Sequence, residues 1–134
     1  MHENLIARVM NMLLSGQDEI LGILREQYKN CKVISIKSSS AGFFVNFDVG
    51  CYLIDNKKYV CDFQIGDVYG SVDGVEAALG FILYIKNGAI TMLEGYTNII
   101  DIWPDDNTIS LCFDSGCYRN YDALRNKWRC RNKY

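Results

Sequence analysis

The chain contains a single histidine, His2, and this scarcity argues against several kinds of site. A Ser-His or Cys-His nucleophile pair needs an imidazole base held in place, and the sequence has no second imidazole. Six cysteines occur, but no two are spaced as C-x-x-C, and the closest pair is Cys112 and Cys117. We therefore expect no histidine-dependent catalysis, no zinc site and no cofactor.

Long apolar runs are also missing. The longest one is a handful of residues, whereas a membrane-spanning helix needs about 20. The opening Met1-His2-Glu3-Asn4 has neither the basic region nor the cleavage site of a signal peptide. We expect a protein of the cytoplasm with no membrane partner.

The size and composition suit one domain. A chain of 134 residues with 49% hydrophobic and 13% aromatic content can form a core without disulfides. We predict a single domain over residues 1–134 with buried, reduced thiols. Export of the chain would make cysteine pairing possible again.

Charge is unevenly distributed along the chain. Residues 45–114 hold three basic and eleven acidic side chains, for −8, whereas residues 115–134 hold six basic and one acidic, for +5. An acidic body repels nucleic acid and attracts basic partners. The alternative is that these acids only keep strand edges and turns soluble.

Helical periodicity dominates the first 30 residues. Apolar residues recur at helical spacing over residues 5–14, and Ser15-Gly16 is a plausible stop. A second helix is predicted from about Asp18, with an apolar stripe over residues 20–28 and acids in its first turn.

From Lys32 onward the apolar period changes to two, which indicates strands. Alternation predicts strands over residues 43–49, 59–65 and 109–113, with a turn at 55–58. Residues 81–85 and 90–97 form the clearest hairpin, because Asn87-Gly88 between them suits a type I′ turn. An antiparallel meander is the most economical connection.

The last segments complete the predicted fold. Residues 121–129 indicate a short basic helix with Tyr121, Leu124 and Trp128 on its inner side. The fold class is α+β, with N-terminal helices packed on one face of a curved antiparallel β-sheet and a short basic C-terminal helix. The other face is the natural site for partners. Pro104, the only proline, predicts either the end of an edge strand or the exit of a strand into a loop.

Two segments resemble ligand sites but have simpler explanations. The run from Gly66 to Gly70 fits neither a phosphate-binding loop nor a dinucleotide fingerprint, and we predict a loop there. Asp101, Asp105 and Asp106 lack the spacing of a calcium loop, and aspartates are common turn formers. No metal site is predicted.

Paired carboxylates are the enzymatic arrangement that the sequence leaves open. Glu94 with Asp101 or Asp62 would act as general acid and base. Glu94 shares the alternation of the apolar residues at 90, 92 and 96, and would therefore face an apolar surface unless a bulge at Gly95 turns it to solvent.

The basic C-terminal segment also has two interpretations. Aromatic residues alternate with its arginines and lysines, as in segments that bind RNA by phosphate contacts and stacking. The simpler interpretation is a basic helix laid against the acidic body, and we prefer it, so no nucleic acid partner is predicted.

Residues 80–106 resemble a segment found in small bacterial immunity proteins of polymorphic toxin and contact-dependent growth inhibition systems. The matching features are the hairpin through Asn87-Gly88, the run Met92-Leu93-Glu94-Gly95-Tyr96-Thr97, and Trp103-Pro104. The resemblance implies a bacterial, non-catalytic protein of the cytoplasm that binds and neutralises one toxin domain, often a basic nuclease.

An acidic surface with exposed aromatic residues would complement such a toxin, and interface energy concentrates in a few aromatic and charged residues. The residues expected to bind the toxin are Asp62, Asp67, Tyr96, Asp101, Trp103, Asp105 and Asp106. The alternative is a non-catalytic domain that holds a small ligand or another partner, with an apolar pocket between helices and sheet.

Overall fold

The computed structural model describes residues 2–50 and 62–128. Its helices are α1 (Glu3–Leu13), α2 (Glu19–Asn30) and α3 (Tyr121–Trp128), with a short 3-10 helix, η2 (Asp106–Thr108). Its strands are β1 (Lys32–Ser39), β2 (Gly42–Asp48), β3 (Phe63–Val72), β4 (Val75–Lys86), β5 (Ala89–Thr97) and β6 (Ser110–Phe113). The predicted α+β class is confirmed: two N-terminal helices, an open six-stranded antiparallel sheet and a short C-terminal helix.

Both N-terminal helices lie where their apolar spacing predicts. The apolar stripe of α1 is buried, and the helix ends at Leu13, next to the predicted stop. Asp18 caps α2, because its side chain accepts a hydrogen bond from the Ile20 amide at 3.0 Å. Arg25 of α2 donates to the carbonyl oxygens of Leu14 and Gly16, which joins the two helices at the end of α1.

The strand order is β1-β2-β5-β4-β3-β6. A simple meander is therefore wrong: β3, β4 and β5 do follow one another, but β2 pairs with β5, and β6 pairs with the outer side of β3. The reason is that local alternation marks a strand without specifying its neighbour. The predicted turn at 55–58 and the first part of the strand predicted at 59–65 lie outside the described residues.

Two tight turns order the central hairpins. Asn87 and Gly88 have φ values of 51° and 78°, which confirms the predicted type I′ turn between β4 and β5. Asp73 and Gly74 have φ values of 50° and 76° and make a similar turn between β3 and β4. This second Asp-Gly pair was not among the predicted turns, and β4 begins at Val75, earlier than predicted.

The loop predicted over residues 66–70 is wrong, because this run belongs to β3. The pairing register shifts between Ile65 and Val68, so Gly66 and Asp67 form a bulge in a continuing strand. Neighbouring strands on both sides supply the hydrogen bonds, and this outweighs the turn preference of glycine and aspartate.

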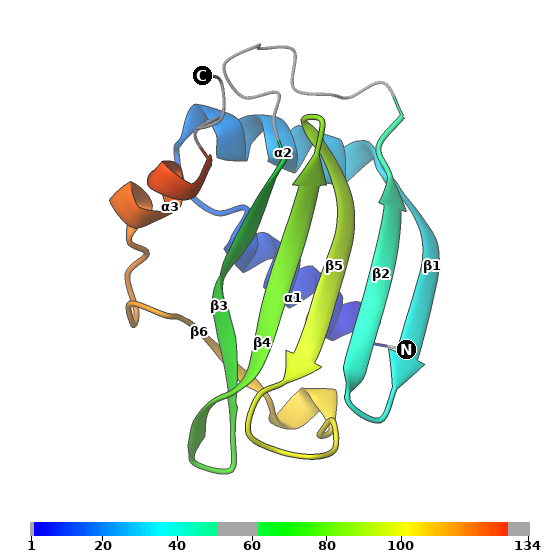
Figure 1. The fold of residues 1–134 in the computed structure, drawn as a ribbon, viewed down its shortest axis with the longest axis vertical. Helices are drawn as coiled ribbons and strands as arrows, with labels where there is room; N and C mark the ends of the chain where they lie inside the picture. Colours follow the sequence, from blue (N-terminus) through cyan, green and yellow to red (C-terminus); the bar gives the residue numbers. More distant parts are fainter. Residues whose placement is uncertain (1, 51–61, 129–134) are drawn as a thin grey trace.

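The two long helices cover one face of the sheet, and α3 lies beside β3 (Figure 1). The core lies between these layers, with fully buried Phe43, Phe81 and Leu83 from the sheet and Leu5 and Leu24 from the helices. The predicted inner side of α3 is confirmed for its buried residues Leu124 and Trp128. The opposite face of the sheet, toward the viewer in Figure 1, carries no helix of the described chain, and we call it the open face.

Candidate functional site

The open face carries an aromatic and apolar set of side chains rather than an ordinary polar one. Strand pairing places Phe44 opposite Glu94 and Glu94 opposite Ile82, so these three form one row across β2, β5 and β4. The side chains of the open face that concern us are Phe44, Asn46, Gln64, Tyr69, Ile82, Tyr84, Met92, Glu94 and Tyr96. Phe44 is 42% exposed, which is unusual for a phenylalanine on a strand.

Glu94 reaches this face because of an irregularity in β5. Ile85 pairs with Ile90 and Tyr84 with Met92, so Thr91 is an extra residue at the shift. Ile90 is therefore buried on the helix side, while Met92 and Glu94 lie on the open face. The prediction that Glu94 and Ile90 lie on the same face of the sheet is therefore wrong. The bulge responsible lies before Met92 and not at Gly95.

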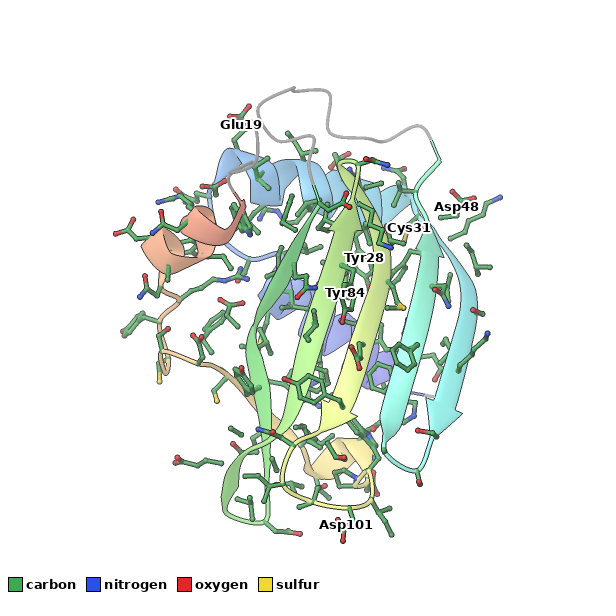
Figure 2. The ribbon with its side chains drawn as sticks, in the orientation of Figure 1. Glu19, Tyr28, Cys31, Asp48, Tyr84 and Asp101 are labelled. Carbon is green, nitrogen blue, oxygen red and sulfur yellow. The ribbon has the colours of Figure 1, made fainter. Side chains whose placement is uncertain are left out.

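Two tyrosines flank the Glu94 carboxylate. The Tyr84 hydroxyl donates to Glu94 Oε1 at 2.8 Å, and Tyr84 lies over the middle of the sheet in Figure 2. Desolvation by burial, followed by this hydrogen bond and the Glu94 charge, raises the pKa of Tyr84 to about 12. Burial, with smaller effects from Tyr69 and Glu94, also raises the pKa of Tyr96. Both phenols are neutral donors at neutral pH.

Glycine makes room for this arrangement. The Tyr96 ring lies over Gly80, where an added Cβ would come within 2.2 Å of its ring carbon and hydroxyl. Tyr69 and Tyr96 are both paired with Gly80, from opposite sides. The gap left by the missing side chain therefore lets the two tyrosines meet across β4.

A hollow of about 620 Å³ lies at the end of the open face nearest the β4–β5 turn. Its lining mixes amide, charged and apolar side chains: Asn46, Asp62, Gln64, Tyr84, Lys86 and Met92. The pocket expected for the small-ligand alternative was between helices and sheet, whereas this one is on the other side of the sheet. Its volume is within the range typical of small-molecule sites.

The loop between β5 and β6 brings together three of the predicted acids. Asp101 and Asp105 are exposed, and Asp106 is half-buried. Asp105 caps η2 by accepting from the Asn107 amide at 3.0 Å, and Figure 2 shows Asp101 at the outer tip of this end of the sheet. Asp106 accepts from His2 Nδ1 at 2.7 Å, which ties the loop to the start of α1.

Trp103 is less exposed than its predicted role requires. Its ring makes edge contacts with Phe43 at 5.3 Å and Phe81 at 5.9 Å, so it closes the end of the core. Its indole N–H donates to Asp106 Oδ1 at 2.8 Å. Trp103 thus holds the acid-bearing loop against the sheet, and only part of its ring is accessible. Pro104 lies in this loop, as its missing N–H predicts.

Asp67 is buried, which contradicts its predicted place on a surface. Arg119 binds both of its carboxylate oxygens, through Nε at 2.7 Å and Nη2 at 2.8 Å. The side chains of Arg119 and Asp67 are only 1% and 8% exposed. The remaining donors of Arg119 reach the carbonyl oxygens of Met12, Leu13 and Ser15 at the end of α1. This buried ion pair ties β3 to the end of α1, and we call it the clamp.

Asp62 lies apart from the other predicted acids. It is exposed, and its Oδ1 accepts from the Asn87 amide at 2.9 Å, at the start of β5. Tyr96 lies near the opposite end of β5, where the chain enters the acid-bearing loop. The structure therefore brings Tyr96, Asp101, Asp105 and Asp106 to one end of the sheet and leaves Asp62 at the other.

The carboxylates weighed for acid–base chemistry are also separated along the sheet. Glu94 lies in the middle of β5 and bonds Tyr84, whereas Asp62 and Asp101 lie near opposite ends. Within the basic segment, Arg119 is buried in the clamp and Arg125 bonds Asp18 Oδ2 at 2.6 Å, as the intramolecular interpretation predicts. Residues 129–134 of that segment lie outside the described residues.

Sequence reasoning named the uncovered face as the site for partners, but of the side chains described above on that face it proposed only Tyr96 for binding the toxin. Phe44 alternates with Phe43 and Val45 in its strand, and an aromatic residue on the side opposite to the core was the available signal. The clustering of Tyr69, Tyr84 and Tyr96 had no local signal, because they come from three strands. The described cysteines, Cys31, Cys112 and Cys117, are free, but none is buried as predicted: the first two are half-buried and Cys117 is exposed.

Comparison with known proteins found no match. No protein-family model, no curated protein and no solved structure is significantly similar to this chain. Over residues 2–50 and 62–128, no helix combines the length and apolar character needed to cross a membrane. In those same ranges, no three histidine, cysteine or acidic side chains gather as metal ligands.

Proposed function

We propose that this protein is an immunity protein, which binds a cognate bacterial toxin domain and neutralises it without catalysis. The observation that carries the proposal is the open face: an uncovered sheet surface with an exposed phenylalanine and half-buried tyrosines, continuous with an acid-rich end. Aromatic residues with exposed, partly apolar surface are typical of protein interfaces. The toxin domain would be basic, since the surface beside these aromatics is acidic.

The acid-rich end of the sheet is formed by two adjoining segments. Asp73 lies in the β3–β4 turn and Glu76 near the start of β4, whereas Asp101 and Asp105 lie on the β5–β6 loop; all four are exposed. The loop is held beside β4, because the Asn98 amide donates to the Ala78 carbonyl at 2.7 Å. We call these four acids the acidic rim.

Few basic residues lie near the acids of the acidic rim along the chain. Between residues 62 and 118, Lys86 is the only lysine or arginine in the sequence, and it lies at the far end of β4. Such a field steers a basic partner and raises its association rate. Asp106 and Trp103 support the rim by fixing the loop, and Tyr96 lies between the rim and the centre of the open face. Asp62 would contact only a partner long enough to span the sheet.

The test is a rescue experiment with charge-reversed variants. The C-terminal domain of the protein encoded immediately upstream is expressed in a host cell with and without this chain, and survivors are counted. We expect toxicity that disappears on co-expression. Asp101→Lys should weaken the rescue and slow association with the purified toxin domain, with a rate that falls as salt rises.

Glu26→Lys is the matched control. It makes the same charge change at an exposed position on α2, which lies on the covered side of the sheet. Rescue by the Glu26 variant together with impaired rescue by the Asp101 variant supports the acidic rim. A harmless upstream domain, or equal killing with and without this chain, would remove the support for an immunity role.

A second candidate function is binding of a small ligand in the 620 Å³ hollow. The observation in its favour is that Asn46, Gln64 and Tyr84 bring polar groups into a recess that also has apolar lining. A screen of small metabolites by thermal shift tests it. A stabilising compound whose effect is lost in Gln64→Ala and retained in Asp101→Lys would favour this function over the first.

A further inference from the structure

We propose that Glu94, with Phe44, Tyr84 and Tyr96, forms a receptor on the open face for one arginine side chain of the protein partner. The inference rests on the proposed function and deepens it, because it names the group of the partner that the centre of the sheet recognises. It concerns a different region from the acidic rim, and it is tested separately.

The position of the Glu94 carboxylate on the sheet favours binding of a cation. Glu94 lies in the middle strand pair, with Phe44 directly opposite on β2 and Ile82 directly opposite on β4. Side chains paired in this way have Cβ atoms about 4.5–5.5 Å apart, so both can contact Glu94. A carboxylate surrounded by aromatic and apolar groups is partly desolvated, and this strengthens its attraction for a cation.

The Glu94 carboxylate has no ion-pair partner among the residues that the structure describes. The ion pairs there involve Asp18, Asp67, Asp106 and Asp122. Tyr84 donates to Oε1, which leaves the second oxygen open to another donor. A neutral phenol stabilises the carboxylate but does not neutralise it.

Aromatic rings surround the Glu94 carboxylate on the open face. Phe44 is 42% exposed, and the Tyr84 and Tyr96 rings lie on the same face. Both tyrosines are uncharged at neutral pH, and the faces of neutral aromatic rings attract cations. A planar guanidinium stacks on such rings while its N–H groups reach a carboxylate, whereas an ammonium offers a point charge with a stronger hydration shell.

The test is an NMR titration with small capped amino acids, which needs no toxin. N-acetyl-arginine methylamide is added to the whole protein, and amide shifts in β2, β4 and β5 are followed. We expect saturable shifts centred on Phe44 and Glu94 with a dissociation constant in the millimolar range. The citrulline counterpart has the same shape without the charge and should bind at least tenfold more weakly; the lysine counterpart should bind several-fold more weakly.

Two variants assign the effect to Glu94. Glu94→Gln keeps an acceptor for Tyr84 and therefore the fold, and should weaken arginine binding at least tenfold. Glu26→Gln removes an equal charge from an exposed position of α2, on the covered side of the sheet, and should leave binding unchanged.

Three results would overturn the receptor: shifts that do not saturate, equal binding of the citrulline compound, or unchanged binding in the Glu94 variant. Equal binding of the lysine compound would overturn the choice of arginine. The outcome is independent of the rescue experiment. Rescue without arginine binding would support the immunity function and refute this site. Arginine binding without rescue would support the site and remove the support for the immunity function.

Discussion

Replacing Arg119 by methionine should destabilise the protein severely. Methionine has a similar length but no charge and no N–H groups. In the native protein Arg119 makes two hydrogen bonds to Asp67 and three to carbonyl oxygens at the end of α1. The substitution would leave the Asp67 carboxylate, which is 8% exposed, without its cation.

The magnitude follows from this burial. Removing one partner of a buried ion pair costs about 3–5 kcal/mol, because the other charge stays desolvated. The carbonyl groups of α1 add to the cost only in part, since some of them gain water. We expect the free energy of unfolding to fall by about 4 kcal/mol, a large share of the roughly 5–15 kcal/mol of a typical domain. The melting temperature should fall by about 10–15 °C.

The assay is urea denaturation of a double-mutant cycle. Asp67→Leu with Arg119→Met removes both charges, so the double variant should be less destabilised than the two single changes predict together, with a coupling energy of about 2 kcal/mol or more. Arg119→Lys should recover only part of the loss, because an ammonium cannot bind two carboxylate oxygens and three carbonyls at once. A loss below about 1 kcal/mol for Arg119→Met, or additive single changes, would refute the clamp.

Three further perturbations test the fold around the candidate site. Gln27→Leu should cost about 2–4 kcal/mol in urea denaturation, because the buried amide serves two backbone groups of the β4–β5 turn, at 2.7 and 2.9 Å; an unchanged stability would contradict this. Gly80→Ala should cost about 1–3 kcal/mol by displacing the Tyr96 ring, and the cost should shrink when Tyr96→Ala is already present. The pKa of Tyr84, raised to about 12 in the folded state, means that the folded protein holds this proton more tightly than the unfolded chain does. The stabilisation that this proton contributes is complete below about pH 10, the ordinary pKa of tyrosine, and is lost as the pH rises from there to about 12. The free energy of unfolding should therefore decline less steeply over that interval in Tyr84→Phe than in the unchanged protein. Parallel declines in the two proteins would show that Tyr84 is not the titrating group.

Local patterns in the sequence were enough for most of the elements. The apolar stripe of α1 depends only on helical geometry, and the cap at Asp18 depends on residues two positions apart. Asn87-Gly88 marks a turn because few other pairs adopt positive φ at both positions. These are short-range steric and hydrogen-bonding effects, and a single sequence contains all their determinants.

The sequence predicted that the surface is rich in acids, but it did not predict which of the proposed residues lie on it. An excess of acids in the middle of the chain is a property of the sequence, and Asp101 and Asp105 are exposed as expected. Trp103 and Asp67, which looked equally suited to a surface, turned inward. Their partners, Phe43 for the indole and Arg119 for the carboxylate, lie 60 and 52 positions away in the chain.

What the sequence determined by itself was the helices, the hairpin at Asn87-Gly88, the strands with clear alternation and the excess of negative charge, because these depend on neighbours within a few residues. It did not predict β1 or the continuation of β3 through residues 66–70. Tertiary structure decided that β2 pairs with β5, that Asp67 is clamped by Arg119, and that Phe44, Glu94 and Tyr84 share one face. Strand pairing and burial join residues distant in the chain, and many pairings satisfy the same local alternation. The packing of all the helices and strands together selects one of these pairings.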